Sequence, residues 1–327
     1  MSDRYLVTGA LGCIGAWVVS NLVAEGTPVT VFDVATEPRR LRLLLTPEQL
    51  ARVSFVAGDI TDLPAFERAL DEHAITHLIH LAALQVPFCR ADPPLGARVN
   101  VVGTVNVFEA VKRRQQISKV VYASSVAVYD TAEAYPAGAP IGHDAHLHPN
   151  NLYGVYKQAN EGTAQVYWQE DQVSSLGLRP YTVYGVGRDQ GMTSTPTKAM
   201  FAAAVGQPYH ISYGGQNDFN YTDDVAKVFI AAARAPFEGA DIFNVHGSAA
   251  HMPEVVAAIE AAAPEMKGKI TFEPKPLALP GEVDGAPLAR VIGDLPVTPL
   301  AESIAETIQR FRALVASGAL TRSDMLK

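Results

Sequence analysis

Apolar residues in the first 125 positions of the chain follow two alternating patterns. Short apolar runs are separated by segments in which apolar residues recur every three or four positions, the spacing of one helix face. The runs lie at residues 4–9, 28–33, 53–59, 76–83 and 118–125. The helical segments lie at residues 13–25, 63–73 and 97–114. Strands that alternate with helices in this way predict a parallel sheet covered on both faces.

The pattern changes after Ser125. A loop rich in proline, alanine, glycine and histidine covers residues 130–150, and glycine, proline and threonine become frequent from Arg179 onward. The elements predicted beyond the loop are a helix at 153–170, a strand at 173–179 and amphipathic helices at 252–263 and 299–317. We therefore expect an α/β fold, a doubly wound parallel sheet with a smaller, partly discontinuous C-terminal region that leans over the sheet edge.

The composition is that of a globular protein with a sizeable core. Of its 327 residues 48% are apolar, and the net charge is −8. A negative chain without long basic runs argues against broad nucleic-acid binding, which needs a concentrated cationic surface. The two cysteines, Cys13 and Cys89, are too few for a disulfide framework. No apolar run reaches membrane length and no leader precedes the first strand, so we expect a cytoplasmic protein without membrane contact.

Three glycines form the corner between the first predicted strand and the first predicted helix. They stand in the pattern T-G-x-x-G-x-x-G, at Gly9, Gly12 and Gly15. Such a corner lets backbone approach a phosphate, although the same spacing also serves tight packing of a helix on a strand. Asp33 ends the second strand, where a carboxylate accepts the ribose hydroxyls of a dinucleotide and repels a 2′-phosphate. Arg39 and Arg40 follow closely, which leaves the exclusion of that phosphate open.

The third and fourth strands end in residues that suit the same ligand. Asp59 and Ile60 follow the third strand, and we expect them beside an adenine. Ala82 and Ala83 follow the fourth strand, and their small side chains let a flat ring or a ribose approach the backbone.

Three residues near the middle of the chain are candidates for acid/base chemistry. Ser125 ends the fifth strand, and Tyr153 and Lys157 lie four residues apart in a predicted helix. Residues at this spacing share one helix face, so a phenol and an ammonium can occupy one site. An adjacent cation stabilises a phenolate, which makes a tyrosine a usable base near neutral pH.

Together these features resemble the extended short-chain dehydrogenase/reductases, specifically the NAD-dependent epimerase/dehydratase group, nearly end to end. The residues that carry the resemblance are Thr8-Gly9-x-x-Gly12-x-x-Gly15, GDITD at 58–62, HLAA at 80–83, Asn100, SSVAVY at 124–129, Tyr153-x-x-x-Lys157 and YTDDVA at 221–226. The resemblance implies bound NAD or NADP and a Rossmann fold. It implies that Tyr153 is the acid/base, that Lys157 holds the nicotinamide ribose and lowers the tyrosine pKa, and that Ser125 hydrogen-bonds the reacting oxygen.

The resemblance also implies how the chain is divided and where the cofactor lies. We expect residues 1–178 to form the NAD-binding domain, with 214–246 returning to it, and 179–213 and 247–327 to form the substrate region. Asp33 favours NAD over NADP. The expected cofactor-binding residues are Gly9, Gly12, Cys13, Ile14, Gly15, Asp33, Asp59, Ile60, Leu81, Ala82, Ala83, Asn100, Ser124, Tyr153 and Lys157.

The chain departs from the family at two substrate positions. Where family members that act on nucleotide sugars carry arginines for the diphosphate, this sequence has Asn217 and Leu279. Without two bidentate guanidiniums we expect a small, unphosphorylated substrate: a free sugar, a sugar acid or lactone, or a polyol. The candidate substrate residues are Gln85, Arg90, Ser125, Arg188, Thr193, Ser194 and Asn217.

Three functions remain open at this point. An NAD-dependent dehydrogenase that oxidises a hydroxyl leads, because an epimerase needs a handle that holds the sugar while it rotates. An epimerase that keeps its NAD is the alternative, and a cofactor-binding sensor without turnover is a third. His143, His146 and His148 invite a metal hypothesis, but they lie in a loop without a ligand helix, so we expect no metal. The resemblance to the family implies a homodimer through helices near 95–114 and 153–170.

Overall fold

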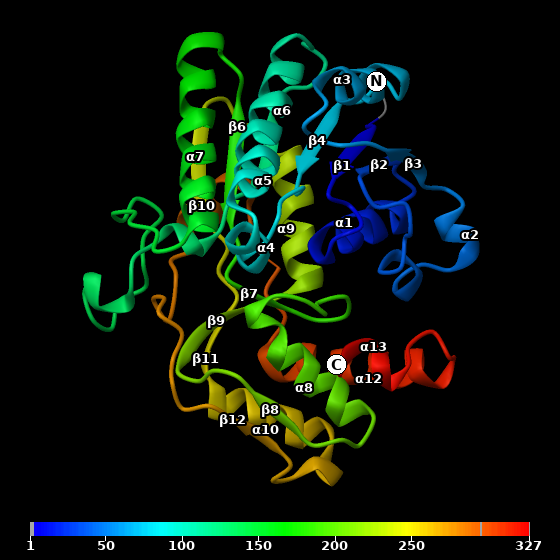
Figure 1. Ribbon diagram of the computed structural model, residues 1–327, viewed down its shortest axis with the longest axis vertical. Helices are drawn as coiled ribbons and strands as arrows, with labels where there is room; N and C mark the ends of the chain where they lie inside the picture. Colours follow the sequence, from blue (N-terminus) through cyan, green and yellow to red (C-terminus); the bar gives the residue numbers. More distant parts are fainter. Residues whose placement is uncertain (1–2, 295, 327) are drawn as a thin grey trace.

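The computed structural model describes residues 3–294 and 296–326, and a seven-stranded sheet organises its larger half (Figure 1). The strands run in the order β10-β6-β5-β4-β1-β2-β3, and every neighbouring pair is parallel. They are β1 (Tyr5–Thr8), β2 (Val29–Asp33), β3 (Ser54–Ala57), β4 (His77–His80), β5 (Val120–Ala123), β6 (Ser175–Arg179) and β10 (Ala240–Asn244). This doubly wound sheet confirms the predicted fold class.

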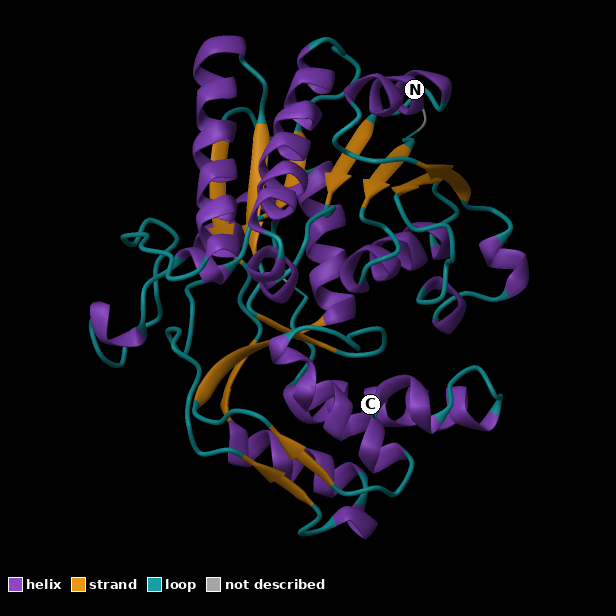
Figure 2. Cartoon of the chain, in the orientation of Figure 1, coloured by secondary structure: helices purple, strands orange, loops and turns teal. Residues whose placement is uncertain are grey.

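Helices cover both faces of the sheet, as the nearly uninterrupted apolar strands require (Figures 1 and 2). One face carries α3 (Leu63–Glu72), α6 (Gly103–Lys112) and α7 (Leu152–Asp171). The other carries α1 (Cys13–Ala24) and α9 (Thr222–Arg234), and α11 (Ala286–Ile292) packs against α9 and β10. Each face therefore has its own apolar core, and both cores leave the carboxyl ends of the strands open to a ligand.

The smaller half lies below those carboxyl ends in the view of Figure 1. Its three-stranded sheet has the order β11-β9-β7, and a separate parallel pair joins β8 to β12. The elements of this half are β7 (Thr182–Tyr184), α8 (Thr195–Ala204), β8 (Tyr209–Ile211), β9 (Gln216–Tyr221), β11 (Ser248–His251), α10 (Met252–Ala262), β12 (Ile270–Phe272) and α12 (Leu300–Ala316). Short helices complete the fold at α2 (Pro47–Leu50), α4 (Val86–Ala91), α5 (Pro93–Ala97) and α13 (Arg322–Met325).

Two predicted boundaries differ from the structure. The segment expected as one helix at 97–114 contains a π-helical turn at Arg98–Val102, between α5 and α6. The segment 214–246 does not join the large sheet as a unit, because β9 pairs with β7 and β11 and only α9 and β10 pack into the larger half. Strand β9 begins with three consecutive polar residues, Gln216, Asn217 and Asp218, and this pattern did not reveal which sheet the strand would join.

Candidate active site

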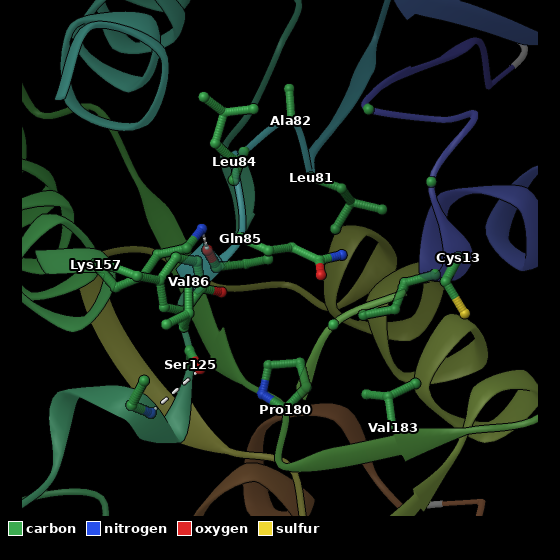
Figure 3. Close-up of a pocket in the computed structure, with 18 of the residues that line it drawn as sticks. Cys13, Leu81, Ala82, Leu84, Gln85, Val86, Ser125, Lys157, Pro180 and Val183 are labelled. Atoms are coloured by element: carbon green, nitrogen blue, oxygen red, sulfur yellow. Dashed lines mark hydrogen bonds between the residues drawn. The ribbon is translucent and has the colours of Figure 1, made fainter. Parts of the chain in front are cut away.

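A cavity of about 750 Å³ lies at the carboxyl ends of the large sheet and is closed below by residues of the smaller half. Figure 3 shows Lys157 and Cys13 on opposite sides of this cavity, with Gln85 between them. The sequence-predicted residues that line it are Gly9, Gly12, Cys13, Ile14, Gly15, Asp33, Asp59, Ile60, Leu81, Ala82, Ala83, Gln85, Ser124, Ser125, Tyr153, Lys157, Arg188 and Thr193. A concave site at this edge of a doubly wound sheet is the usual place for a dinucleotide and its substrate.

The glycine corner has no room for side chains. Gly9 has φ +65°, and a Cβ on it would lie 2.6 Å from the backbone nitrogen of Ala82. A Cβ on Gly15 would lie 2.5 Å from the carbonyl oxygen of Gly9. Gly12 precedes α1 and offers no side-chain cap, so the first N–H groups of that helix face the cavity's end unblocked. Bare backbone and a helix N-terminus at one place fit the pyrophosphate of a dinucleotide.

Asp33 is held in place beside this corner. One oxygen of its carboxylate accepts a hydrogen bond from the backbone N–H of Leu11 at 3.0 Å, and the other accepts one from Ala35 at 3.0 Å. The carboxylate lines the cavity and keeps further lone pairs for ribose hydroxyls. Asp33 therefore joins the second strand to the glycine corner at the end of the site where the sequence places the ribose.

The three acid/base candidates come together at the other end of the cavity. Ser125 follows β5 and caps a short 3₁₀ turn, where its Oγ accepts a hydrogen bond from Ala127 N–H at 3.2 Å (Figure 3). Tyr153 lies in the first turn of α7, and the next residue, Gly154, packs against that 3₁₀ turn. A Cβ on Gly154 would lie 2.1 Å from the carbonyl oxygen of Ala127, so only glycine lets the helix bring its tyrosine this near to the serine.

Lys157 lies one turn further along the same helix face. Its Nζ donates a 2.6 Å hydrogen bond to the carbonyl oxygen of Ala123 and lies 5.6 Å from the centre of the Tyr153 ring. Burial lowers the pKa of this lysine to about 8, although Cys89 and Glu161 oppose the shift. The ammonium is thus positioned between the end of β5 and the tyrosine ring.

Burial dominates the titration of the tyrosine. It raises the pKa of the Tyr153 phenol above its usual value, whereas a hydrogen bond with Ser125 and the charge of Arg188 act to lower it. The family resemblance implies a lowered pKa, so the direction in the protein alone is the opposite one. The physical reason is desolvation, which penalises the charged phenolate in an enclosed site until a further positive charge arrives.

Sequence reasoning missed a buried network behind the catalytic candidates. Glu161 accepts hydrogen bonds from Ser124 Oγ and, through both carboxylate oxygens, from Arg179 at 2.8 and 2.7 Å. Both charged side chains are almost fully buried. The network ties α7 to β5 and β6, and so fixes the helix that carries Lys157. A signal was present, because Glu161 lies four residues after Lys157 on the same helix face.

Asn100 does not line the cavity, but its side chain hydrogen-bonds to a residue that does. Its side chain is buried in the π-helical turn, where Oδ1 accepts from the backbone N–H of Leu84 at 2.7 Å and Nδ2 donates to the Leu84 carbonyl at 2.9 Å. Leu84 itself lines the cavity in the segment after β4. Asn100 therefore holds that segment instead of contacting the space for the cofactor.

Three candidate substrate residues also lie outside the cavity lining. Arg90 is exposed on α4. Ser194 is buried and donates to the carbonyl of Gly191 at 2.8 Å. Asn217 is fully buried in β9, where its amide donates to the carbonyl of Gly214 at 3.3 Å. These three side chains are directed to solvent or to their own backbone, which the residue pattern did not reveal.

The structure also bears on the metal and membrane questions. Over residues 3–294 and 296–326, no three side chains of histidine, cysteine, aspartate or glutamate gather as metal ligands. His148 pairs with Asp130 at 3.1 Å, and its ring stacks on that of His146. Within the same described residues, no helix has the length and apolarity needed to cross a bilayer.

Comparisons with known proteins identify the family of the chain. Residues 5–245 match the model of the NAD dependent epimerase/dehydratase family. A UDP-glucose 4-epimerase from Mycolicibacterium smegmatis is 33% identical over 323 residues, covering 94% of this chain and 98% of the relative. A UDP-glucuronate 4-epimerase from Arabidopsis thaliana is 31% identical over 68% of this chain and 53% of the relative.

Solved structures share the fold. The Thermus thermophilus UDP-glucose 4-epimerase in complex with NAD superposes with a TM-score of 0.78 at 28% identity, covering 94% of this chain and 99% of that one. An L-threonine dehydrogenase from Clostridium difficile reaches a TM-score of 0.82 at 20% identity, which shows a common fold. These matches confirm the predicted family and the predicted cofactor, NAD, and they support an NAD-dependent enzyme activity of the epimerase/dehydratase family. The chain belongs to the NAD-dependent epimerase/dehydratase family.

Proposed function

We propose that the chain oxidises a hydroxyl of a small, unphosphorylated sugar, sugar acid or lactone, or polyol, with NAD as the oxidant. The observation that carries this proposal is the substrate end of the cavity, where neither family arginine position presents a guanidinium. Asn217 is buried and its amide donates to the carbonyl of Gly214, just before its strand, and Leu279 contributes an apolar side chain to the cavity wall. Desolvating a diphosphate against such a wall lacks two of the bidentate contacts that offset its cost in the family.

Arg188 supports a sugar acid as the first substrate to try. Its guanidinium lines the cavity, and its Nη2 donates to Thr193 Oγ1 at 3.0 Å. Among the described residues its Nε is buried and has no hydrogen-bond partner, and no carboxylate forms an ion pair with it. One guanidinium with unused donors suits one carboxylate of a substrate.

The roles that we propose for the catalytic residues follow from their positions. Tyr153 removes the proton of the reacting hydroxyl, and Ser125 donates a hydrogen bond to the same oxygen as it becomes a carbonyl. We propose that the Lys157 ammonium, 5.6 Å from the centre of the Tyr153 ring, favours the phenolate. When bound, NAD supplies a positively charged ring that accepts a hydride from the carbon bearing the hydroxyl.

The cofactor residues have proposed roles too. The glycine corner and the N-terminus of α1 hold the pyrophosphate, Asp33 holds the adenosine ribose, and Asp59 and Ile60 lie beside the adenine. In this proposal the larger half holds NAD and the smaller half shapes the substrate end.

The experiment is a spectrophotometric screen for NADH. Purified protein and NAD⁺ are mixed with free aldoses, sugar acids and polyols, and with UDP-glucose and UDP-glucuronate in parallel. Net NADH from a sugar acid supports the proposal, and Tyr153→Phe is expected to abolish the signal. A panel silent for free compounds contradicts it.

A second candidate, an NAD-retaining 4-epimerase, is favoured by the relatives that share about a third of the sequence. It uses the same serine, tyrosine and lysine and returns the hydride to the other face of the sugar. Interconversion of UDP-sugars without net NADH, measured by chromatography in the same screen, identifies this activity.

We also propose a homodimer through α7 and the neighbouring helical segment. Val155 and Val166 of α7 and Val102 of the π-helical turn are 43%, 47% and 48% exposed, and a partner helix could cover them. Sedimentation as a monomer at micromolar concentration contradicts this proposal.

A further inference from the structure

Two arginines follow Asp33 and stand near the ribose end of the cavity. Arg40 lines the cavity together with Asp33, and Arg39 is its neighbour in the chain. A free guanidinium at this place is what an enzyme needs to accept the ribose 2′-phosphate of NADP. The sequence therefore permits either cofactor, and the contacts of the two arginines decide between them.

Asp189, about 150 residues further along the sequence, pairs with both arginines. It lies in the loop after β7, with only 5% of its side chain exposed. One carboxylate oxygen accepts a 2.6 Å hydrogen bond from Arg40 Nη2, and the other accepts one from Arg39 Nη2. Each guanidinium thus already has an anionic partner before any cofactor binds.

Arg40 is fixed by two further contacts. Its Nε donates to the carbonyl of Gly187 at 3.0 Å, in the same loop as Asp189. Its Nη1 donates to the carbonyl of Leu11 at 2.9 Å, within the glycine corner. All three guanidinium nitrogens are therefore committed, and the loop is attached to the corner that faces the pyrophosphate.

We propose that Asp189 is a specificity-determining residue that selects NAD over NADP by holding Arg39 and Arg40 away from a ribose 2′-phosphate. To bind that phosphate, the arginines must leave a buried carboxylate without its counter-charges, which is a costly state. The phosphate also meets two carboxylates, Asp33 and Asp189, instead of one. The preference thus depends on a loop about 150 residues away in sequence, as well as on the strand end.

The test measures the dissociation constants of NAD and NADP for the whole protein and for Asp189→Asn, by titration calorimetry. Asparagine keeps the size of the side chain and removes its charge. We expect NADP to bind about 10-fold more tightly to the variant and NAD to change by less than about 3-fold. Adding Arg39→Ala and Arg40→Ala to the same variant is expected to return the affinity for NADP to that of the unmutated protein. Weaker binding of both cofactors, or no change for NADP, overturns the proposal.

Glu37→Gln is the matched control. Glu37 lines the same small surface recess as Asp189 and the two arginines, but it pairs with Arg42. Its substitution removes the same charge from the same neighbourhood without releasing Arg39 or Arg40. An equal gain in NADP affinity in this control overturns the proposal. It would mean that losing any negative charge near this recess favours NADP, whether or not Arg39 and Arg40 are released.

Asp33→Asn provides a second test that does not depend on folding of the loop variant. With Asp189 intact, we expect Asp33→Asn to gain less than about 3-fold in NADP affinity, because the arginines remain engaged. The double variant with Asp189→Asn is expected to exceed the sum of the two single effects. A large NADP gain in Asp33→Asn alone overturns the proposal, whatever the stability of Asp189→Asn.

Discussion

Backbone atoms shape one end of the cavity, and side chains shape the other. At the cofactor end the shape comes from backbone, since Gly9 and Gly15 have no space for a Cβ and α1 presents uncapped N–H groups. At the proposed substrate end the shape comes from side chains such as Leu279 and Arg188. Backbone geometry admits few alternatives, whereas side chains on a fixed frame can be exchanged singly. This difference accords with a cofactor common to the family and with a proposed substrate that differs from the UDP-sugars named for the relatives.

Tyr153→Phe is expected to give the largest difference between an effect on turnover and an effect on NAD binding. Loss of the phenolic oxygen is expected to lower turnover about 1,000-fold with the substrate that the screen identifies, because the proton acceptor is removed. The dissociation constant of NAD is expected to change by less than about 3-fold. Tyr156→Phe is the control, since that hydroxyl donates to the carbonyl of Pro93 at 3.0 Å and lies outside the cavity lining. Equal losses of turnover and NAD binding would show that the ends are not separable.

Gly9→Ala tests the backbone end. Its Cβ would lie 2.6 Å from Ala82 N at a positive φ, so we expect a loss of about 3 kcal/mol in the free energy of unfolding and weaker NAD binding. Gly26→Ala is the control, because Gly26 also has a positive φ, +74°, but nothing within 4 Å of a Cβ. It is expected to cost about 1 kcal/mol and to leave NAD binding intact. Denaturant unfolding measures the free energy of unfolding, and calorimetry measures NAD binding. Similar effects of the two variants contradict the proposed role of the glycine corner in NAD binding.

Lys157→Met probes the buried ammonium through pH. Its pKa is about 8 in the folded protein and 10.5 unfolded, so the unfolded state binds more protons between these values. The stability that this group contributes therefore rises with pH across that window. We expect the free energy of unfolding of the unmutated protein, relative to Lys157→Met, to rise by about 2 kcal/mol from pH 8 to about pH 9.5. A difference that stays flat or falls over this range contradicts the burial of a charged lysine beside Tyr153.

Leu279→Arg gives the smallest expected effect and sharpens the substrate end. A guanidinium in the cavity wall is expected to tighten UDP binding about 10-fold, by offering a bidentate contact to a phosphate. Leu277→Arg is the matched control, because Leu277 lines the same wall at a position without a family arginine. Tight UDP binding by the unmutated protein, unimproved in Leu279→Arg, would remove the contrast on which the proposed substrate rests.

Much of the larger half could be predicted because its strands are short apolar runs between periodic helices. The confirmed fold class follows from that local pattern, and the confirmed cofactor follows from the family resemblance together with the glycine corner and Asp33. The π-helical turn at Arg98–Val102 could not be predicted, since its residues continue a helical periodicity on both sides. Pairing of Asp189 with Arg39 and Arg40 joins segments about 150 residues apart, and no local pattern records such a contact.

The orientation of the candidate substrate residues also depends on contacts that a local sequence pattern does not record. Asn217 occupies a motif position, but which way its side chain points depends on the pairing of β9 with β11 and β7. The motif supplied the position and left the orientation undetermined. Roles for these side chains therefore stay predictions until binding is measured.

The return of the chain to β10 has a consequence for synthesis and folding. Strand β6 is complete at residue 179, but its outer neighbour β10 begins only at residue 240, after most of the small sheet has been made. A nascent chain that ends between them exposes the edge of a buried strand, a surface prone to pairing with other chains. We therefore expect a fragment cut after β6 to aggregate more readily than the full chain, because the buried strand β6 then takes the open edge that β10 occupies in the full chain.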